Sequence, residues 1–240
     1  MKGVNVHAPI LHRDPVPLTV DDFMLLKRAG SFAGYGKVEL LDGELSGVRL
    51  QDDDEPEYDG SEPVRLDGRA YRLLAEAGSL QDHGKTELLD GAIYAMSPQY
   101  RPHGFVKDEI AYWLRRALEA LGSSLHVATE QSVALSSFNE PQPDIMLTSE
   151  PRGDGPIPGA SVVLVCEVSA STLAFDLREK ARIYAQAGVP EYWVVDVDAR
   201  IVHQMWAPVG DRFTQSRDVP FDARIESVTI PDLAVDTAAL

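Results

Sequence analysis

Two acidic residues stand at positions where a charge needs a chemical reason. Asp144 follows a proline and precedes the apolar run Ile145 to Leu147, and Glu167 ends the run Val162 to Cys166. The second run has no polar position and is rich in β-branched residues, which is typical of a strand covered on both faces. If a Pro- and Gly-rich loop pairs the two strands antiparallel, Asp144 lies beside Glu167. The two carboxylates would then share a site.

A helix predicted after Glu167 brings a lysine to the same place. At about 100° per residue, Lys180 falls in the middle of the apolar face of this helix. A buried ammonium without a partner is costly to desolvate, so we expect one of the two acids to pair with it. The alternative is a surface salt bridge to Asp176, four residues earlier. The apolar face consists of Leu173, Leu177, Ala181, Tyr184 and Ala187.

The segment after this helix completes a strand, helix, strand unit. Gly188 and Pro190 end the helix, as a glycine followed by proline commonly does. The run Glu191 to Asp196 is the next strand, and a right-handed crossover leaves Lys180 over the sheet. The pattern therefore predicts an α/β fold in which three charged side chains meet at one end of a covered sheet.

Two carboxylates and an ammonium suit the metal-assisted hydrolysis of a phosphodiester. A hard divalent cation neutralises the phosphate and lowers the pKa of a bound water. Asp144 and Glu167 would be the metal ligands, and Lys180 would orient the attacking water or stabilise the transition state. The alternative for the acids is a structural one, in which a buried carboxylate caps the amides of a loop.

Several motifs follow one another in order along the chain. They are Glu87-Leu88-Leu89-Asp90-Gly91, Met96-Ser97-Pro98, His103, Glu140-Pro141-Gln142-Pro143-Asp144, Glu167-Val168-Ser169, Asp176 to Lys180, and Ala187 to Asp196. Together they resemble the PD-(D/E)XK nuclease superfamily and, within it, the restriction-endonuclease branch called the Uma-two family. The resemblance covers roughly Leu66 to Leu240. One position departs from the superfamily pattern, because Ser169 stands two residues after Glu167 where a lysine is expected, and Lys180 would be that lysine, moved onto the helix.

The resemblance implies a restriction-endonuclease-like fold, with a mixed sheet flanked by helices. It also implies an endonuclease that cleaves DNA with Mg²⁺, or with Mn²⁺ as a substitute. Glu87 recurs in the family pattern and is a candidate further acid, although Glu39 holds the same place in a segment without a site. His103 either meets a phosphate or caps a helix. A homodimer is expected from the resemblance, since one site cleaves one strand at a time.

A repeat precedes the nuclease-like motifs. Residues 18–48 resemble residues 66–96 at a fixed offset of 48, and both contain the sequence Glu-Leu-Leu-Asp-Gly. Each copy is predicted to form a short helix, Val20 to Ala29 or Ala70 to Ala77, followed by a hairpin that turns at Asp-Gly. Only the second copy leads into the nuclease-like motifs. The fold prediction therefore adds an N-terminal duplicated helix-hairpin module.

Two domains are predicted. Residues 1–65 would hold an extended arm, the first copy and an acidic linker within Gln51 to Pro63, and residues 66–240 would form the nuclease-like domain. Seven acidic residues in the linker repel one another and cannot build a core. A metal-binding or DNA-mimicking role for them is the less favoured alternative.

Composition limits the possible partners. The 240 residues carry a formal net charge of −16, which disfavours tight non-specific binding to DNA. The single cysteine, Cys166, excludes a disulfide framework, and no apolar stretch approaches the ~20 residues that span a bilayer. We therefore expect a soluble cytoplasmic protein. A local basic rim could still attract DNA, from Lys85, Arg101, Lys107, Arg115, Arg116, Arg178 and Arg182.

The acidic charge also supports a rival interpretation. A nuclease fold without activity could serve as a regulatory or protein-interaction module, with the first copy of the repeat as its binding surface. The presence of Asp144, Glu167 and Lys180 favours the enzyme. The net charge favours the rival.

Overall fold

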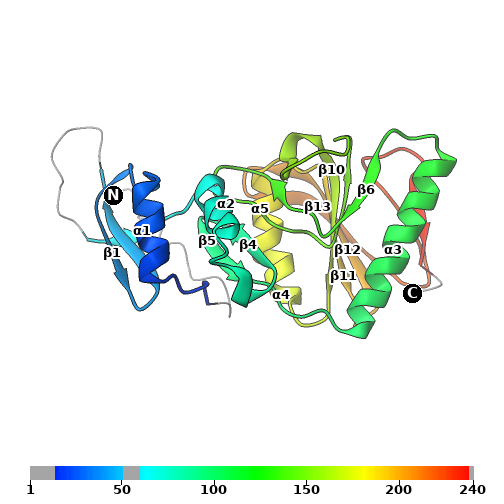
Figure 1. Ribbon diagram of the computed structural model, residues 1–240. Coiled ribbons are helices and arrows are strands. Elements are labelled where there is room, and N and C mark those ends of the chain that lie inside the picture. Colours follow the sequence, from blue (N-terminus) through cyan, green and yellow to red (C-terminus); the bar gives the residue numbers. More distant parts are fainter. Residues whose placement is uncertain (1–13, 51–59, 238–240) are drawn as a thin grey trace, which may run out of the picture.

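A six-stranded mixed sheet forms the centre of the protein (Figure 1). The computed structural model describes residues 14–50 and 60–237, so most of the predicted arm and of the acidic linker lies outside it. Neighbouring strands are antiparallel except for one parallel pair, β10 and β11. In sheet order the strands are β13 (Arg212–Pro220), β12 (Ile201–Val209), β11 (Glu191–Asp196), β10 (Val162–Ser169), β8 (Ile145–Thr148) and β6 (His126–Thr129).

Helices cover both faces of this sheet. On one face lies α3 (Arg101–Ala120), with the hairpin of β14 (Arg224–Glu226) and β15 (Ala234–Asp236). The other face is covered by α4 (Leu173–Phe175), a π-helical turn (Asp176–Lys180) and α5 (Ala181–Gln186). The predicted mixed sheet flanked by helices is confirmed.

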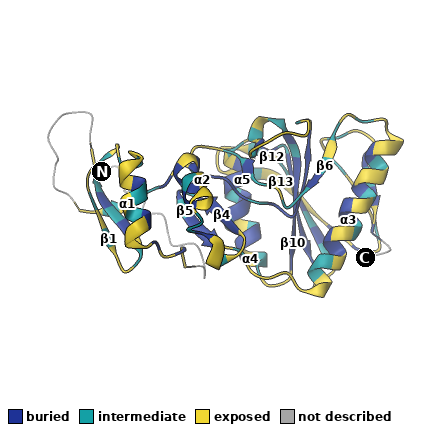
Figure 2. Ribbon diagram, viewed as in Figure 1, coloured by how far each residue is buried: buried dark blue, intermediate teal, exposed yellow. Residues whose placement is uncertain are grey.

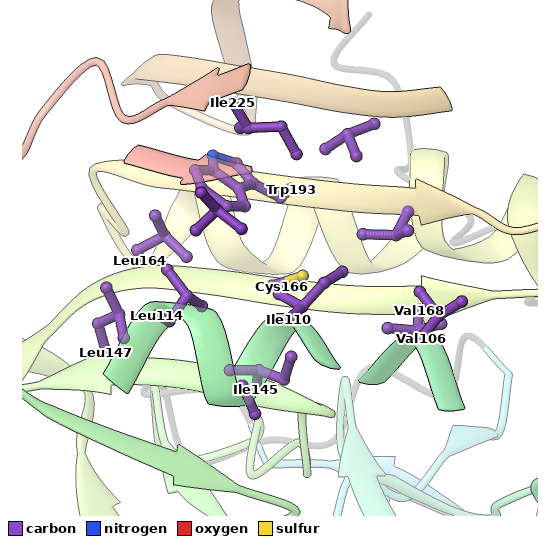
Figure 3. Packing of buried hydrophobic residues seen from close by; sticks show 14 of the residues in the cluster. Val106, Ile110, Leu114, Ile145, Leu147, Leu164, Cys166, Val168, Trp193 and Ile225 are labelled. Atoms are coloured by element: carbon purple, nitrogen blue, oxygen red, sulfur yellow. The ribbon is translucent and has the colours of Figure 1, made fainter. Parts of the chain in front are cut away.

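The alternation of side chains along β10 decides which residue meets which helix. Leu164 and Cys166 pack with Ile110 and Leu114 of α3, as Figure 3 shows. Val165 points to the opposite face and packs with Tyr184 of α5. Glu167 has the same parity as Val165, so its carboxylate lies on the side of α5.

Local backbone geometry sets two boundaries. Helix α3 begins at Arg101, because Pro102 suits the first turn of a helix. β6 and β7 (Val133–Ala134) are separate strands, since Glu130 between them adopts a positive φ of 52°. β7 pairs with β9 (Ile157–Pro158), and 3₁₀ turns occupy Gln81–His83 and Gly159–Ser161.

Two helix-hairpin units lie at the N-terminal end (Figure 1). The first unit, residues 20–49, contains α1 (Val20–Arg28), β1 (Tyr35–Leu41) and β2 (Glu44–Arg49). The second unit, residues 68–95, contains α2 (Gly68–Glu76), β4 (Thr86–Leu89) and β5 (Ala92–Ala95). Both hairpins turn at Asp-Gly with positive φ at both residues, as a type I′ turn requires. A two-residue strand, β3 (Glu62–Pro63), joins the first hairpin.

The two units differ in how far their residues are buried. Figure 2 shows a more exposed first unit and a more buried second unit, which lies against α5. Within the described residues, none of the helices is long and apolar enough to cross a membrane.

A buried carboxylate fastens the C-terminal segment to the sheet. Glu191, at the start of β11, is 0 % exposed. It accepts hydrogen bonds from the Val228 and Thr229 amides and from the Ser227 and Thr229 hydroxyls, at 2.7–3.2 Å. The Trp193 indole N–H donates a further bond of 2.6 Å. These donors satisfy the charge that the sheet encloses.

We predict that Glu191→Ala lowers the free energy of unfolding by roughly 3 kcal/mol, because several buried donors lose their acceptor. Urea unfolding followed by circular dichroism measures this change. The control is Glu226→Ala at an exposed position of β14, which should change stability by no more than about 0.5 kcal/mol. Equal losses in the two variants would contradict the fastening role.

Candidate active site

The strand register places the two acids side by side. In the antiparallel pair of β8 and β10, Ile145 stands opposite Cys166, so the next pair outward is Asp144 and Glu167. The Asp144 amide donates to Glu167 Oε2 at 3.3 Å, and both side chains are buried. Asp144 Oδ2 also accepts a 2.8 Å bond from the Val168 amide. The acids therefore meet as expected, and Asp144 also caps backbone, which was the structural alternative.

Lys180 points inward to these acids rather than outward to solvent. Its Nζ lies 3.0 Å from Glu167 Oε1 and 3.2 Å from Glu87 Oε2, and its side chain is 5 % exposed. The structure thus does not show the surface salt bridge to Asp176 that was the alternative. Asp176 is itself buried and accepts a 2.6 Å bond from the Thr172 hydroxyl.

A π-helical turn runs from Asp176 to Lys180, and the residues at its two ends are both buried. A π turn holds one residue more than an α turn, which changes the phase of the side chains along the helix. Such turns are frequent at functional sites. Ala181 and Tyr184 continue on the sheet-facing side after the turn.

Three further polar side chains contact the acids. The Tyr184 hydroxyl donates to Glu167 Oε1 at 2.7 Å. Gln99 donates through Nε2 to Asp144 Oδ1 at 2.9 Å, and His103 Nε2 lies 3.2 Å from Asp144 Oδ2. Sequence reasoning missed Gln99 and the hydroxyl of Tyr184. The available signals were the place of Gln99 directly after Met96-Ser97-Pro98, and the spacing of four residues between Lys180 and Tyr184 on one helix face.

A second charged group lies behind Gln99. Lys107 donates to Gln99 Oε1 at 2.8 Å and pairs with Glu130, which also pairs with Lys85. The hydrogen bonds from Lys107 and then Lys85 lower the pKa of Glu130 to about 2. Lys85 and Lys107 are thus engaged within the protein, as is Arg182, which pairs with Asp90. These three residues do not form the free basic rim that the sequence suggested.

A small cavity opens over the acids. It has a volume of about 150 Å³. Glu87 is not among its lining residues and stands behind Lys180, so this acid does not reach the cavity that Asp144 and Glu167 line. The polar residues that line it are Ser97, Gln99, His103, Asp144, Glu167, Ser171, Thr172, Asp176, Lys180 and Asp198.

Burial and the charges of neighbouring groups shift the pKa values of Glu167, Asp176 and Lys180. Burial raises the pKa of Glu167 and of Asp176, and the charge of Lys180 offsets part of the effect. Burial alone would lower the pKa of Lys180, but the surrounding carboxylates outweigh it and hold that pKa above its ordinary value. Four carboxyls, those of Asp144, Glu167, Asp176 and Asp198, thus line the cavity with a single ammonium. This excess of acidic groups favours a cation.

The residues fit a divalent ion held by two carboxylates. Glu167 Oε2 accepts one hydrogen bond, and that bond is a long one of 3.3 Å. His103 Nδ1 is buried and has no hydrogen-bond partner within the described residues. No three His, Cys, Asp or Glu side chains of the described part of the chain are arranged to hold an ion by themselves. Asp144 and Glu167 would therefore need a backbone carbonyl or water to complete an octahedral shell.

The fold and the site define a mixed α/β protein with an acid pair at adjacent strand ends and a buried lysine on the following helix. The chain belongs to the Uma2 family, the Uma-two family that its motifs resemble. That family is described as "Putative restriction endonuclease", and it matches residues 70–238. The match does not include the first helix-hairpin unit.

A solved structure from Anabaena variabilis is similar to this chain. Its title describes a "putative nuclease belonging to DUF820". The two are 15 % identical, the TM-score is 0.46, and the similarity covers 65 % of this chain and 84 % of the other. No curated protein matches the sequence.

We predict that Lys180→Met lowers the free energy of unfolding by roughly 3–5 kcal/mol near pH 9, because buried carboxylates lose their counter-charge. Without the ammonium the pKa of Glu167 rises further. A carboxyl with a higher pKa in the folded state stabilises the fold below its unfolded pKa, and this contribution is lost as the pH rises. Because the pKa of Glu167 in the wild type is itself raised to about 8, the deficit relative to wild type should be smaller near pH 6 than near pH 9.

Urea unfolding at both pH values measures that deficit. Lys85→Met is the matched control, because Lys85 is 52 % exposed and its ion pair with Glu130 is worth at most about 1 kcal/mol. A deficit for Lys180→Met that grows as the pH falls would contradict the arrangement of charges described above.

Proposed function

We propose that this protein is a metal-dependent endonuclease that hydrolyses DNA phosphodiester bonds, with Mg²⁺ as the natural ion and Mn²⁺ as a substitute. The observation that carries the proposal is the meeting of Asp144 and Glu167 at adjacent strand ends, with the Lys180 ammonium 3.0 Å from Glu167. Membership in the Uma2 family supports the same class of reaction.

Each residue has a role that follows from its contacts. Asp144 and Glu167 would hold the ion, which when bound would supply Lewis acidity and a water of lowered pKa. Lys180 favours the ionised form of Glu167 by its charge and would donate to the phosphate or to the attacking water. Tyr184 and Gln99 fix the two carboxylates through one hydrogen bond each. His103 stands beside Asp144 at the cavity, where it donates to a phosphate oxygen when protonated.

The net charge shapes how DNA would bind. With 38 acidic and 22 basic residues, the long-range field repels a polyanion. Attraction must then come from the ion and from the few cations near the cavity. We propose weak binding with a shallow salt dependence, because few cations would contact phosphates, and cleavage only with the ion present. The same charge favours the second candidate, a catalytically silent protein-interaction module.

The domain organisation is part of the proposal. Residues 66–240 would form the nuclease domain, and residues 1–65 would carry an accessory duplicate of the second helix-hairpin unit. Cutting both strands of a duplex requires two sites, so a homodimer or two successive events would be needed.

We predict that the protein cleaves supercoiled plasmid DNA in Mg²⁺ or Mn²⁺ and that Glu167→Gln lowers the rate at least about 100-fold, since it removes one charged ligand. Glu150→Gln at a surface loop is the control and should cleave as wild type does. Equal cleavage by wild type and Glu167→Gln would identify a contaminating nuclease. Metal-induced stabilisation in a thermal melt, absent in Asp144→Asn, separates ion binding from catalysis.

We predict that Tyr184→Phe lowers metal affinity about 10–100-fold, because the hydroxyl that orients Glu167 is lost while the ring still packs. The measurement is the Mn²⁺ concentration that gives half-maximal cleavage, together with the Mn²⁺ dependence of the melting temperature. Tyr112→Phe, at a half-exposed position of α3, is the control. A Tyr184→Phe variant that loses stability without any shift in Mn²⁺ dependence would show a structural role alone.

A further inference from the structure

The two helix-hairpin units exchange the segments that lead into their helices. The Val16 amide, which precedes α1, donates to the Ile93 carbonyl of the second unit at 2.7 Å. The Val64 amide, which precedes α2, donates to the Leu45 carbonyl of the first unit at 3.0 Å. Val64 and Ile93 follow Val16 and Leu45 by the repeat offset of 48. The second bond is therefore the first bond with the units interchanged.

A second pair of contacts has the same reciprocity. Pro15 stands opposite Tyr94 of β5 in an antiparallel bridge, and Pro63 stands opposite Ser46 of β2. The offset of 48 again relates the two contacts. In a twofold dimer, residue i of one subunit contacts residue j of the other, and j contacts i in return. The two units obey this rule within one chain.

The helices complete the paired arrangement. Leu26 of α1 and Leu74 of α2 are related by the same offset, are both 0 % exposed, and belong to one shared apolar core. Burying equivalent leucines from both units in one core is typical of a stable subunit interface. The apolar face of the second unit that could bind another copy of the chain is thus already covered by the first unit.

The outer faces of the two units differ. Leu89 and Tyr94 of the second unit pack against Phe175 and Ile183, which flank the π-helical turn and its lysine. Leu41, the counterpart of Leu89, is 62 % exposed. Ser46 replaces Tyr94, and Glu44 replaces Ala92. The first unit therefore ends the stack with a more polar face and carries no nuclease domain of its own.

We infer that the first unit takes, within one chain, the place of the helix-hairpin unit of a second copy, and that the protein is a monomer with one site. Tethering supports this arrangement, because a short linker gives an effective concentration on the order of millimolar, far above that of a second chain in a dilute solution. The inference departs from the homodimer expected from the sequence. It goes beyond the proposed function and does not depend on nuclease activity.

Paired cysteines in the full-length chain test the arrangement. Residues opposite one another in antiparallel strands have Cα atoms about 4.5–5.5 Å apart, which suits a disulfide. The variants are Pro15→Cys with Tyr94→Cys, and Ser46→Cys with Pro63→Cys. The second variant leaves the buried Tyr94 unchanged and tests the symmetry-related contact between Ser46 and Pro63. The control, Pro15→Cys with Ser46→Cys, joins positions that would pair only if each leading segment lay on its own hairpin.

Non-reducing electrophoresis after mild oxidation and sedimentation equilibrium of the unmodified chain give the result. We expect disulfides within single chains in both test variants, no disulfide in the control, and the mass of one chain up to about 100 µM, well below the effective concentration of the tether. A mass of two chains, disulfide-linked dimers, or a disulfide in the control would each overturn the inference. Loss of cleavage in the Glu167→Gln variant leaves it unaffected, since no measurement here uses activity.

Discussion

The balance of charge around Lys180 is the constraint on which the rest of the structure depends. One ammonium lies among buried carboxyls, bonded to Glu167 and close to Glu87. Ions removed from water are tolerated only when their partners are placed well. The strands, the helix and the second helix-hairpin unit each supply one of these partners, so the site forms only when all three are assembled. Folding and the capacity for chemistry are therefore tied to the same few contacts.

The sheet fixes half of this arrangement through its geometry alone. Antiparallel pairing of β8 with β10 sets Asp144 against Glu167, and alternation along β10 sends Glu167 to the side of α5. The apolar residues between these positions form the core with α3 on the opposite face. A shift of one residue in register would turn Glu167 into that core. The same strand register therefore places both the apolar core and the two acids.

Much of this could be predicted from the sequence, because the signals were local or periodic. The unbroken apolar run of β10 identified a central strand, and the Asp-Gly sequences identified the turns of two hairpins. The helix periodicity showed that Lys180 faces the sheet. Contacts between distant segments could not be predicted in this way. Gln99, Lys107 and Glu130 join into one chain of bonds with Asp144 only after α3 and β6 have packed, and no short spacing connects them.

The end of β6 at Thr129 was also beyond the sequence. Glu130 adopts a positive φ, which few side chains favour, and its pairing with Lys85 and Lys107 supports that conformation from outside the segment. Likewise the π-helical turn has no clear sequence signature. Its inward lysine is paired with Glu167 and Glu87, which come from distant parts of the chain.

The contact between the second helix-hairpin unit and the helix has a mechanical consequence. In this chain the strand position two after Glu167 holds Ser169, so the amine comes from a helix rather than from the sheet. A strand is held by its ladder of hydrogen bonds, whereas a helix resting on a sheet can slide. Leu89 and Tyr94 press on Phe175 and Ile183 at either side of the lysine and oppose that movement. The unit thus holds the helix in place. A looser contact between them would lengthen the distance from the Lys180 ammonium to Glu167.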